Sequence, residues 1–402
     1  MKYDFTTIMD RLGKDAIAVD VPEKAPAFGP REEGFDFIPM WIADMNFATV
    51  PTVQEAISER LAHPAFGYFM TRDEYYQAII NWQEKRNGVT GLTKEAIGYE
   101  NGVLGGLVSA LNAFAAPGDS VLVHSPTYIG FTGSITNAGY KIVHSELKQD
   151  AEGIWRMDYE DMDAKIKANK IHVAVFCNPH NPTGRVWERE EIEKAMEVYR
   201  KNDCVVISDE IWSDLIRKGR RHIPTQSVSE DAKNRTIAIY APSKTFNLAG
   251  LIGSYHVVYN PMLRDRLRKC GSSTFYNNMN VLSMYALIGA YSEEGEEWLE
   301  ELREVLDENI NYAYEFISTH WTGVSLAKPE GTYMLYLDCG EWCREHGKTI
   351  EEVYHEGLRY GVIWQDGRPF NKPDTIRMNL AVPYTLVKEA FERLDKYVFG
   401  VL

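Results

Sequence analysis

The middle of this sequence alternates short apolar runs with longer amphipathic stretches, and this alternation constrains the fold more than any other feature. Five runs are typical of buried strands: residues 121–125, 172–179, 204–210, 236–244 and 252–260. Between the second and third runs, Trp187 to Lys201 carries apolar residues near helical spacing. Strand–helix–strand alternation predicts an α/β fold, in which helices flank a mainly parallel sheet on both faces.

The pattern changes after about Pro261. Residues 294–320 predict one long, charged, amphipathic helix, and strands are expected near 332–338, 361–364 and 375–380. This combination predicts a second, smaller α+β domain. We expect three parts along the chain: an N-terminal segment, 1–48, that packs with the small domain; a large domain, 49–288; and the small C-terminal domain, 289–402.

Composition and charge exclude several classes of partner. The formal net charge of -15 argues against binding to nucleic acid or to an anionic membrane surface. No stretch reaches the roughly 18 to 20 apolar residues of a membrane span, and the charged N-terminus is not expected to be a signal peptide. Five scattered cysteines favour a reduced, cytoplasmic location. Cys339 and Cys343 have no further ligands at metal-binding spacing, so no metal site is expected.

Polar residues of three kinds follow three successive predicted strands. They are the turn NPHNPTG (178–184), then Ser208-Asp209-Glu210, then Ser243-Lys244-Thr245. A single polar segment after a strand could be an ordinary turn. Ligands of open α/β sheets, however, bind at the carboxyl ends of the strands. An amide, a carboxylate and an amine in this order suit a pyridine aldehyde cofactor.

Each of these groups has a chemical use toward such a cofactor. A partly desolvated lysine can form the imine, and a carboxylate facing the pyridine nitrogen favours the protonated ring, which withdraws electrons more strongly. An amide can donate to the phenolic oxygen. Backbone N–H groups at a helix start can hold the phosphate.

The motifs at these strand ends resemble those of a known family. The turn NPHNPTG, SDEIW and SKTFNLAG are similar to the pyridoxal phosphate (PLP)-dependent aminotransferase superfamily of fold type I. Further motifs resemble its C–S lyase branch, which contains the MalY/PatB-type cystathionine β-lyases: PMWIADMNF (39–47), HPAFGY (63–68), SPTYIGF (125–131), VISDEI (206–211), SKTFNLAGL (243–251) and IRMNLA (376–381). The resemblance runs through nearly the whole chain. It implies PLP, a seven-stranded sheet in the large domain, and a homodimer with a shared active site.

The resemblance also implies roles for single residues around the cofactor. Lys244 would be the Schiff-base lysine and the proton shuttle at the substrate Cα, Asp209 would pair with the pyridine nitrogen, and Asn181 would donate to the ring oxygen. The remaining cofactor contacts would come from the stacking ring of Tyr128, the backbone N–H groups of Val103 and Leu104, and the hydroxyl of Ser243. For Tyr128, packing in the core is the alternative.

Three further positions would bind the substrate or complete the site across a dimer. Arg377 would bind the substrate α-carboxylate, a geometry that suits the planar guanidinium. The backbone at Ala43, together with Asn181, would lie near the same substrate. Tyr68 would reach the phosphate from the neighbouring subunit. For Arg377 the alternative is a solvent-facing arginine on an edge strand.

This sequence departs from the common aminotransferase pattern at three positions. Trp212 stands where many relatives have a tyrosine, Ile252 where many have a phosphate-binding arginine, and Ala241 where a serine is frequent. The phosphate would then depend more on Tyr68, Ser243 and the helix start. The absent arginine agrees with the lyase branch.

The resemblance leads to an expected reaction with two alternatives. We expect a C–S β-lyase that acts on cystathionine, cysteine or related S-conjugates and releases a thiol, pyruvate and ammonia. Thiolates are good leaving groups because thiols are fairly acidic. An amino acid aminotransferase is the first alternative, and a protein of the same fold that mainly binds a regulatory partner is the second.

Overall fold

The computed structural model describes residues 1–274 and 277–400, which form two compact units. The α/β unit comprises Thr49–His180 and Arg185–Leu299, and the α+β unit comprises Met1–Ala48, Asn181–Gly184 and Glu300 onward. The second boundary falls inside a helix between Leu299 and Glu300, whereas the sequence led us to expect it between 288 and 289. The residues of α11 (Glu293–His320) therefore contribute to both units.

A seven-stranded sheet forms the centre of the α/β unit, in the order β2-β10-β9-β8-β7-β3-β4. All its neighbours pair in parallel except β10, which is antiparallel to both β9 and β2. The mostly parallel α/β sheet predicted from the sequence is thus confirmed. The strands are β2 (Ile97–Glu100), β3 (Ser120–Ser125), β4 (Lys141–Glu146), β7 (Val173–Cys177), β8 (Val205–Asp209), β9 (Thr236–Tyr240) and β10 (Ser254–Val257).

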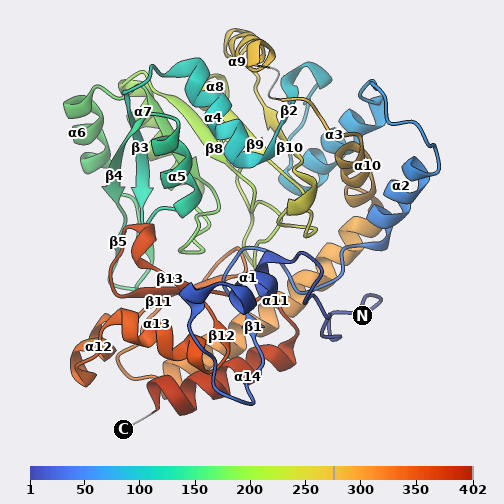
Figure 1. Cartoon of the computed structure of the whole chain (residues 1–402). Helices are drawn as coiled ribbons and strands as arrows, with labels where there is room; N and C mark the ends of the chain where they lie inside the picture. The colour runs from blue at the N-terminus through green and yellow to red at the C-terminus, as the bar shows by residue number, and fades with distance from the viewer. Residues whose placement is uncertain (275–276, 401–402) are drawn as a thin grey trace. The chain divides into compact units, whose positions relative to one another are not determined.

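Helices and a small hairpin surround this sheet. The helices are α2 (Pro51–Leu61), α3 (Asp73–Asn87), α4 (Gly102–Phe114), α5 (Ile129–Asn137), α6 (Tyr159–Asn169), α7 (Arg189–Lys201), α8 (Glu230–Arg235), α9 (Pro261–Thr274) and α10 (Val281–Ala290). The hairpin pairs β5 (Lys148–Gln149) with β6 (Trp155–Arg156). Figure 1 shows α4 and α5 in front of the sheet. One core cluster joins α4 residues to alternate strand residues, including Ile207 and Ile239.

The alternation along β8 decides which residue faces which side. Ile207 packs in the cluster with α4, and Asp209, two residues on, points to the same face because side chains alternate along a strand. Ser208 and Glu210 therefore face the other side. Strands β7 and β8 are buried almost throughout, as expected for parallel strands covered on both faces.

The α+β unit contains a three-stranded sheet in the order β11-β14-β13 and a parallel pair of β1 with β12. Its strands are β1 (Ile38–Pro39), β11 (Met334–Asp338), β12 (Val362–Ile363), β13 (Gln365–Asp366) and β14 (Thr375–Asn379). Its further helices are α1 (Ile17–Lys24), α12 (Gly340–His346), α13 (Ile350–Arg359) and α14 (Tyr384–Leu394). On β14, Ile376 and Met378 enter the core, so Thr375, Arg377 and Asn379 share the opposite, polar face.

Several strands are shorter than the apolar runs that predicted them, and the difference matters most before Lys244. The run 236–244 forms a strand only as far as Tyr240, and a turn follows in which the Phe246 N–H donates to the Pro242 carbonyl at 2.8 Å. Proline has no N–H to donate to a ladder, which favours the end of the strand. Lys244 therefore lies in this turn and not at the last strand residue. No helix among the described residues is long and apolar enough to cross a membrane.

Candidate active site

Asp209 ends β8 as a buried carboxylate, 5% exposed. Burial raises its pKa to about 7, with a smaller upward contribution from Glu210. The Ile211 N–H, which donates to Oδ1 at 3.0 Å, and the charge of Lys244 oppose this rise. Such a carboxylate favours a partner that shares a proton or carries positive charge.

Lys244 is half-buried in the turn after β9 and acts electrostatically on Asp209. Two hydrogen bonds shape its surroundings: the Leu248 N–H donates to the Ser243 carbonyl at 3.0 Å, and the Thr245 hydroxyl donates to Asp214 at 3.0 Å. The predicted lysine and carboxylate are thus brought together within the α/β unit. Their order along the sheet follows from the parallel pairing of β8 with β9.

The backbone N–H groups predicted to hold the phosphate lie at the start of α4. Gly102, the first helical residue, has φ of 72°, a left-handed conformation that glycine adopts readily. Asn101 makes no side-chain cap, so the first N–H groups of the helix, including those of Val103 and Leu104, have no side-chain acceptor from that residue. Free N–H groups at a helix start are suited to an anion.

Tyr128 lies between β3 and α5 with its ring half-buried. The ring meets Phe131 edge-on at 5.3 Å between centroids and packs at the margin of the core cluster. Gly130 lies against the same ring, where an added Cβ would come within 2.4 Å of it. Both readings of Tyr128, stacking residue and core residue, agree with this position.

Arg377 lies on the middle strand of the α+β sheet and is 2% exposed. The alternative of a solvent-facing arginine on an edge strand is therefore wrong. Its guanidinium donates to Asn181 Oδ1 at 3.1 Å, to the Trp41 carbonyl at 3.0 Å and to Gln365 Oε1. It also lies 4.9 Å from the ring centroid of Phe370. The structure thus joins Arg377 directly to Asn181.

The backbone around Ala43 is held by the same strand. Asn379 Nδ2 donates to the carbonyls of Ile42, at 2.7 Å, and Asp44, at 2.5 Å. Because Arg377 and Asn379 share the polar face of β14, the turn that contains Ala43 and the guanidinium are positioned by one strand.

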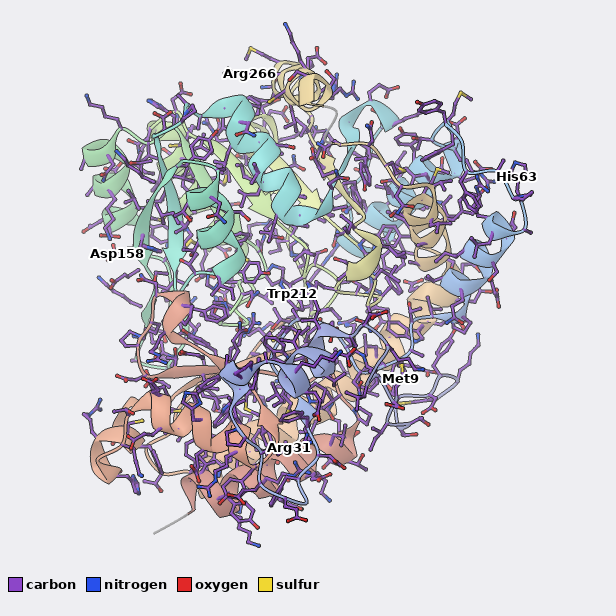
Figure 2. The ribbon with its side chains drawn as sticks, viewed as in Figure 1. Met9, Arg31, His63, Asp158, Trp212 and Arg266 are labelled. Carbon is purple, nitrogen blue, oxygen red and sulfur yellow. The ribbon has the colours of Figure 1, made fainter. Side chains whose placement is uncertain are left out.

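Tyr68 is not brought to any of these residues within the chain. It is fully exposed on the connection between α2 and α3, together with Phe66, Phe69 and Met70. Figure 2 shows His63, at the start of this connection, at the outer margin of the unit. A run of exposed apolar residues of this kind is typical of a protein–protein contact.

The three departures from the aminotransferase pattern have different surroundings. Trp212, labelled in Figure 2, is buried at 1% exposure and Ala241 at 4%. Ile252 is 57% exposed and has φ of 47°, which is unusual for a β-branched residue. Its carbonyl accepts a hydrogen bond from the Tyr99 hydroxyl at 2.7 Å.

Two partners of Arg377 were missed from the sequence. Gln365 begins β13, just after a predicted strand, and Trp41 lies in the motif 39–47. Neither residue type indicates such a contact by itself, because the contact depends on the pairing of β13 with β14. Among the described residues, no group of three or more His, Cys, Asp or Glu side chains could hold a metal, and none of the five cysteines forms a disulfide.

Comparisons with known proteins agree with this arrangement. Residues 36–394 match the family Aminotransferase class I and II, and the chain belongs to this family. It is 32% identical to cystathionine β-lyase PatB of Bacillus subtilis, over 96% of this chain and 97% of that protein.

Two solved structures resemble the whole chain. The PLP-bound C–S lyase from Staphylococcus hominis is 31% identical, with a TM-score of 0.89 over 99% of this chain and 98% of that one. Cystalysin from Treponema denticola, which contains PLP, is 30% identical, with a TM-score of 0.90 over 98% of both chains. The fold type I architecture and the family resemblance inferred from the motifs are confirmed.

Proposed function

We propose that this protein is a PLP-dependent C–S β-lyase that cleaves cystathionine, cysteine or a related S-conjugate to a thiol, pyruvate and ammonia. The observation that carries the proposal is the full-length similarity to cystathionine β-lyase PatB in a chain that has Lys244, Asp209, Asn181 and Arg377 in the motifs of the family. The similarity to two PLP-containing structures, one of them a C–S lyase, supports it further.

The residues of the α/β unit fit PLP. When bound, PLP supplies an aldehyde that condenses with amines and a ring that accepts electrons from the substrate Cα. Lys244 would hold the aldehyde carbon, Asp209 the ring nitrogen, Ser243 and the N–H groups of Val103 and Leu104 the phosphate. The raised pKa of Asp209, caused mainly by burial, suits a carboxylate that shares a proton with that nitrogen.

The remaining residues would bind and move protons around the substrate. Arg377 would bind the α-carboxylate, with its fork held in place by Asn181 and Gln365. Tyr128 would cover the ring and exclude water, and Asn181 would donate to the ring oxygen. Once exchanged for the substrate amine, Lys244 would take the Cα proton and later return a proton during release.

A homodimer would complete the site. Tyr68 is too exposed to serve its own chain's core, and Phe66, Phe69 and Met70 expose apolar surface beside it. We therefore propose that this connection docks on a second copy, where Tyr68 reaches the phosphate. Light scattering should give twice the monomer mass. The five cysteines, none of which forms a disulfide, agree with a proposed cytoplasmic location.

Purified protein with cystathionine and no keto acid tests the reaction. Stoichiometric pyruvate and free thiol support the lyase. Amino transfer that requires 2-oxoglutarate, without pyruvate, would refute it in favour of the aminotransferase alternative. A chain that binds PLP and turns over neither type of substrate would point to the regulatory alternative.

A further inference from the structure

A second carboxylate, Glu210, follows Asp209 directly and is completely buried. Four donors surround it. His222 Nε2 and the Tyr240 hydroxyl each lie 2.7 Å from Oε2, while the Ser208 hydroxyl, at 2.9 Å, and the Thr225 N–H, at 3.0 Å, donate to Oε1. A carboxylate that accepts this many hydrogen bonds is stabilised in its charged form.

The surroundings of Glu210 lower its pKa by more than burial raises it. Although burial raises the pKa of a carboxyl group, the hydrogen bond from His222 and the charge that His222 carries when protonated, and then the bonds from Tyr240 and Thr225, leave the pKa of Glu210 below its ordinary value. Glu210 is therefore an anion at neutral pH, whereas Asp209, with its pKa of about 7, is divided between its two forms. The pKa values of these two neighbouring carboxylates are shifted in opposite directions because, of the two, Glu210 is the one that accepts hydrogen bonds from four donors.

His222 is the partner of Glu210 that could cancel its charge. Its ring donates from Nε2, while Nδ1 is buried and finds no acceptor in the described part of the chain. A second proton, on Nδ1, would be a buried donor without an acceptor among the described residues, which is unfavourable. The negative charge of Glu210 is uncompensated only if this ring is neutral.

The other titratable groups around this pair are the Tyr259 phenol, which responds to the charge of Glu210, and the buried Asp214 carboxylate, which interacts electrostatically with His222 and Arg86. Tyr240 of β9 stacks on Tyr255 of β10 at 5.6 Å between centroids, and burial raises the pKa of both phenols. The Ser208 and Thr225 hydroxyls lie 2.9 Å apart. Across the sheet, the charged groups that act on Asp209 are Glu210 and Lys244.

We propose that Glu210 is a positioning residue of the reaction: its negative charge, on the far face of β8, strengthens the hold of the PLP ring nitrogen on the proton that it shares with Asp209. This rests on the proposed role of Asp209. The farther face of the sheet would then contribute to catalysis without touching cofactor or substrate. Coulomb attraction between Glu210 and that proton supplies the effect, and the low dielectric of the interior strengthens it.

Holoenzyme carrying PLP labelled with ¹⁵N in the ring tests the proposal, because the ¹⁵N chemical shift follows protonation of that nitrogen with pH. Glu210→Gln keeps the volume and removes the charge. We expect the nitrogen to lose its proton about one pH unit lower, a tenfold weaker hold, with kcat reduced and KM little changed. Ser208→Ala, the matched control, removes one hydrogen bond and keeps the charge, so its nitrogen should titrate as in the wild type.

His222→Gln provides a second test that does not depend on the stability of Glu210→Gln. The amide can still donate to Glu210, so the nitrogen should titrate as in the wild type if His222 is neutral. A markedly tighter hold on the proton in this variant would mean that His222 had been cationic, and would refute the proposal. Equal shifts in Glu210→Gln and Ser208→Ala, or no shift in Glu210→Gln, would also refute it.

Asp209→Asn separates this proposal from the proposed function. A changed ¹⁵N titration in Asp209→Asn, together with a wild-type titration in Glu210→Gln, would refute only the role of Glu210. A wild-type titration in Asp209→Asn itself would refute the assignment of Asp209 to the ring nitrogen.

Discussion

In the α/β unit the ionisable groups of the predicted site act on one another, whereas Arg377 in the α+β unit is held by neutral acceptors. Burial and the neighbouring charges of Lys244 and Glu210 together place the pKa of Asp209 near neutrality. The acceptors of Arg377 include an Asn181 amide, a Gln365 amide and the Trp41 carbonyl, none of which cancels its charge. One unit is thus suited to moving protons, and the other to holding an anion in a fixed orientation.

Lys244→Ala should abolish proton transfer by the α/β unit. Without the amine, turnover should fall by about three to four orders of magnitude, since both the covalent attachment and the Cα base are lost. The visible absorption band of bound PLP should also change. Lys201→Ala, an exposed lysine on α7, is the control. Turnover within tenfold of the wild type in Lys244→Ala would contradict the assignment.

Arg377→Lys should weaken substrate binding by the α+β unit and leave PLP binding by the α/β unit unchanged. Lysine keeps the charge but loses the planar fork, so kcat/KM should fall about 10- to 100-fold, mainly through KM. PLP affinity should be unchanged, as measured by equilibrium dialysis. Arg359→Lys, at an exposed ion pair with Glu32, is the control. An equal loss of PLP affinity would argue against the division between the two units.

Asp209→Asn sharpens the comparison through pH. The folded pKa of about 7 lies above the ordinary 3.8, so the folded apoprotein binds more protons than the unfolded chain between about pH 4 and pH 7. The free energy of unfolding of the wild-type apoprotein therefore falls as pH rises through this window. Asp209→Asn does not show this fall, because an amide does not titrate there. The difference between the Tm of the variant and that of the wild-type apoprotein should therefore rise by on the order of 2–4 °C from pH 4 to pH 7, and it should stay constant above pH 7. A pH-independent difference would contradict the raised pKa.

Tyr68→Phe should give the smallest effect, because it removes one hydroxyl outside both units' cores. We expect PLP to bind about three- to tenfold more weakly, the contribution of one hydrogen bond, with the dimer intact by light scattering. Tyr68→Ala should weaken the dimer as well. If both variants bind PLP as the wild type does, Tyr68 does not contact the phosphate.

Much of this arrangement could be predicted from local patterns. Apolar runs located the strands that end at Ser125, Cys177 and Asp209, because parallel strands buried on both faces are continuously apolar. The strand before Lys244 was predicted four residues too long, since an apolar run does not show where a proline-containing turn begins. The surroundings of Arg377 were not predictable, because they depend on β13, β14 and residues 41 and 181, which are far apart in the chain.

The sequence by itself determined the order of strands and helices, the family, and which amine, carboxylate and amide follow the strands. These depend on periodicity and on residues close together in the chain. Only the tertiary structure decided that Arg377 is buried on a central strand, that Tyr68 faces outward, and that Glu210 is a buried carboxylate surrounded by four hydrogen-bond donors. Burial, dielectric surroundings and hydrogen-bond partners come from distant segments, so they set the properties of these groups only once the chain has folded.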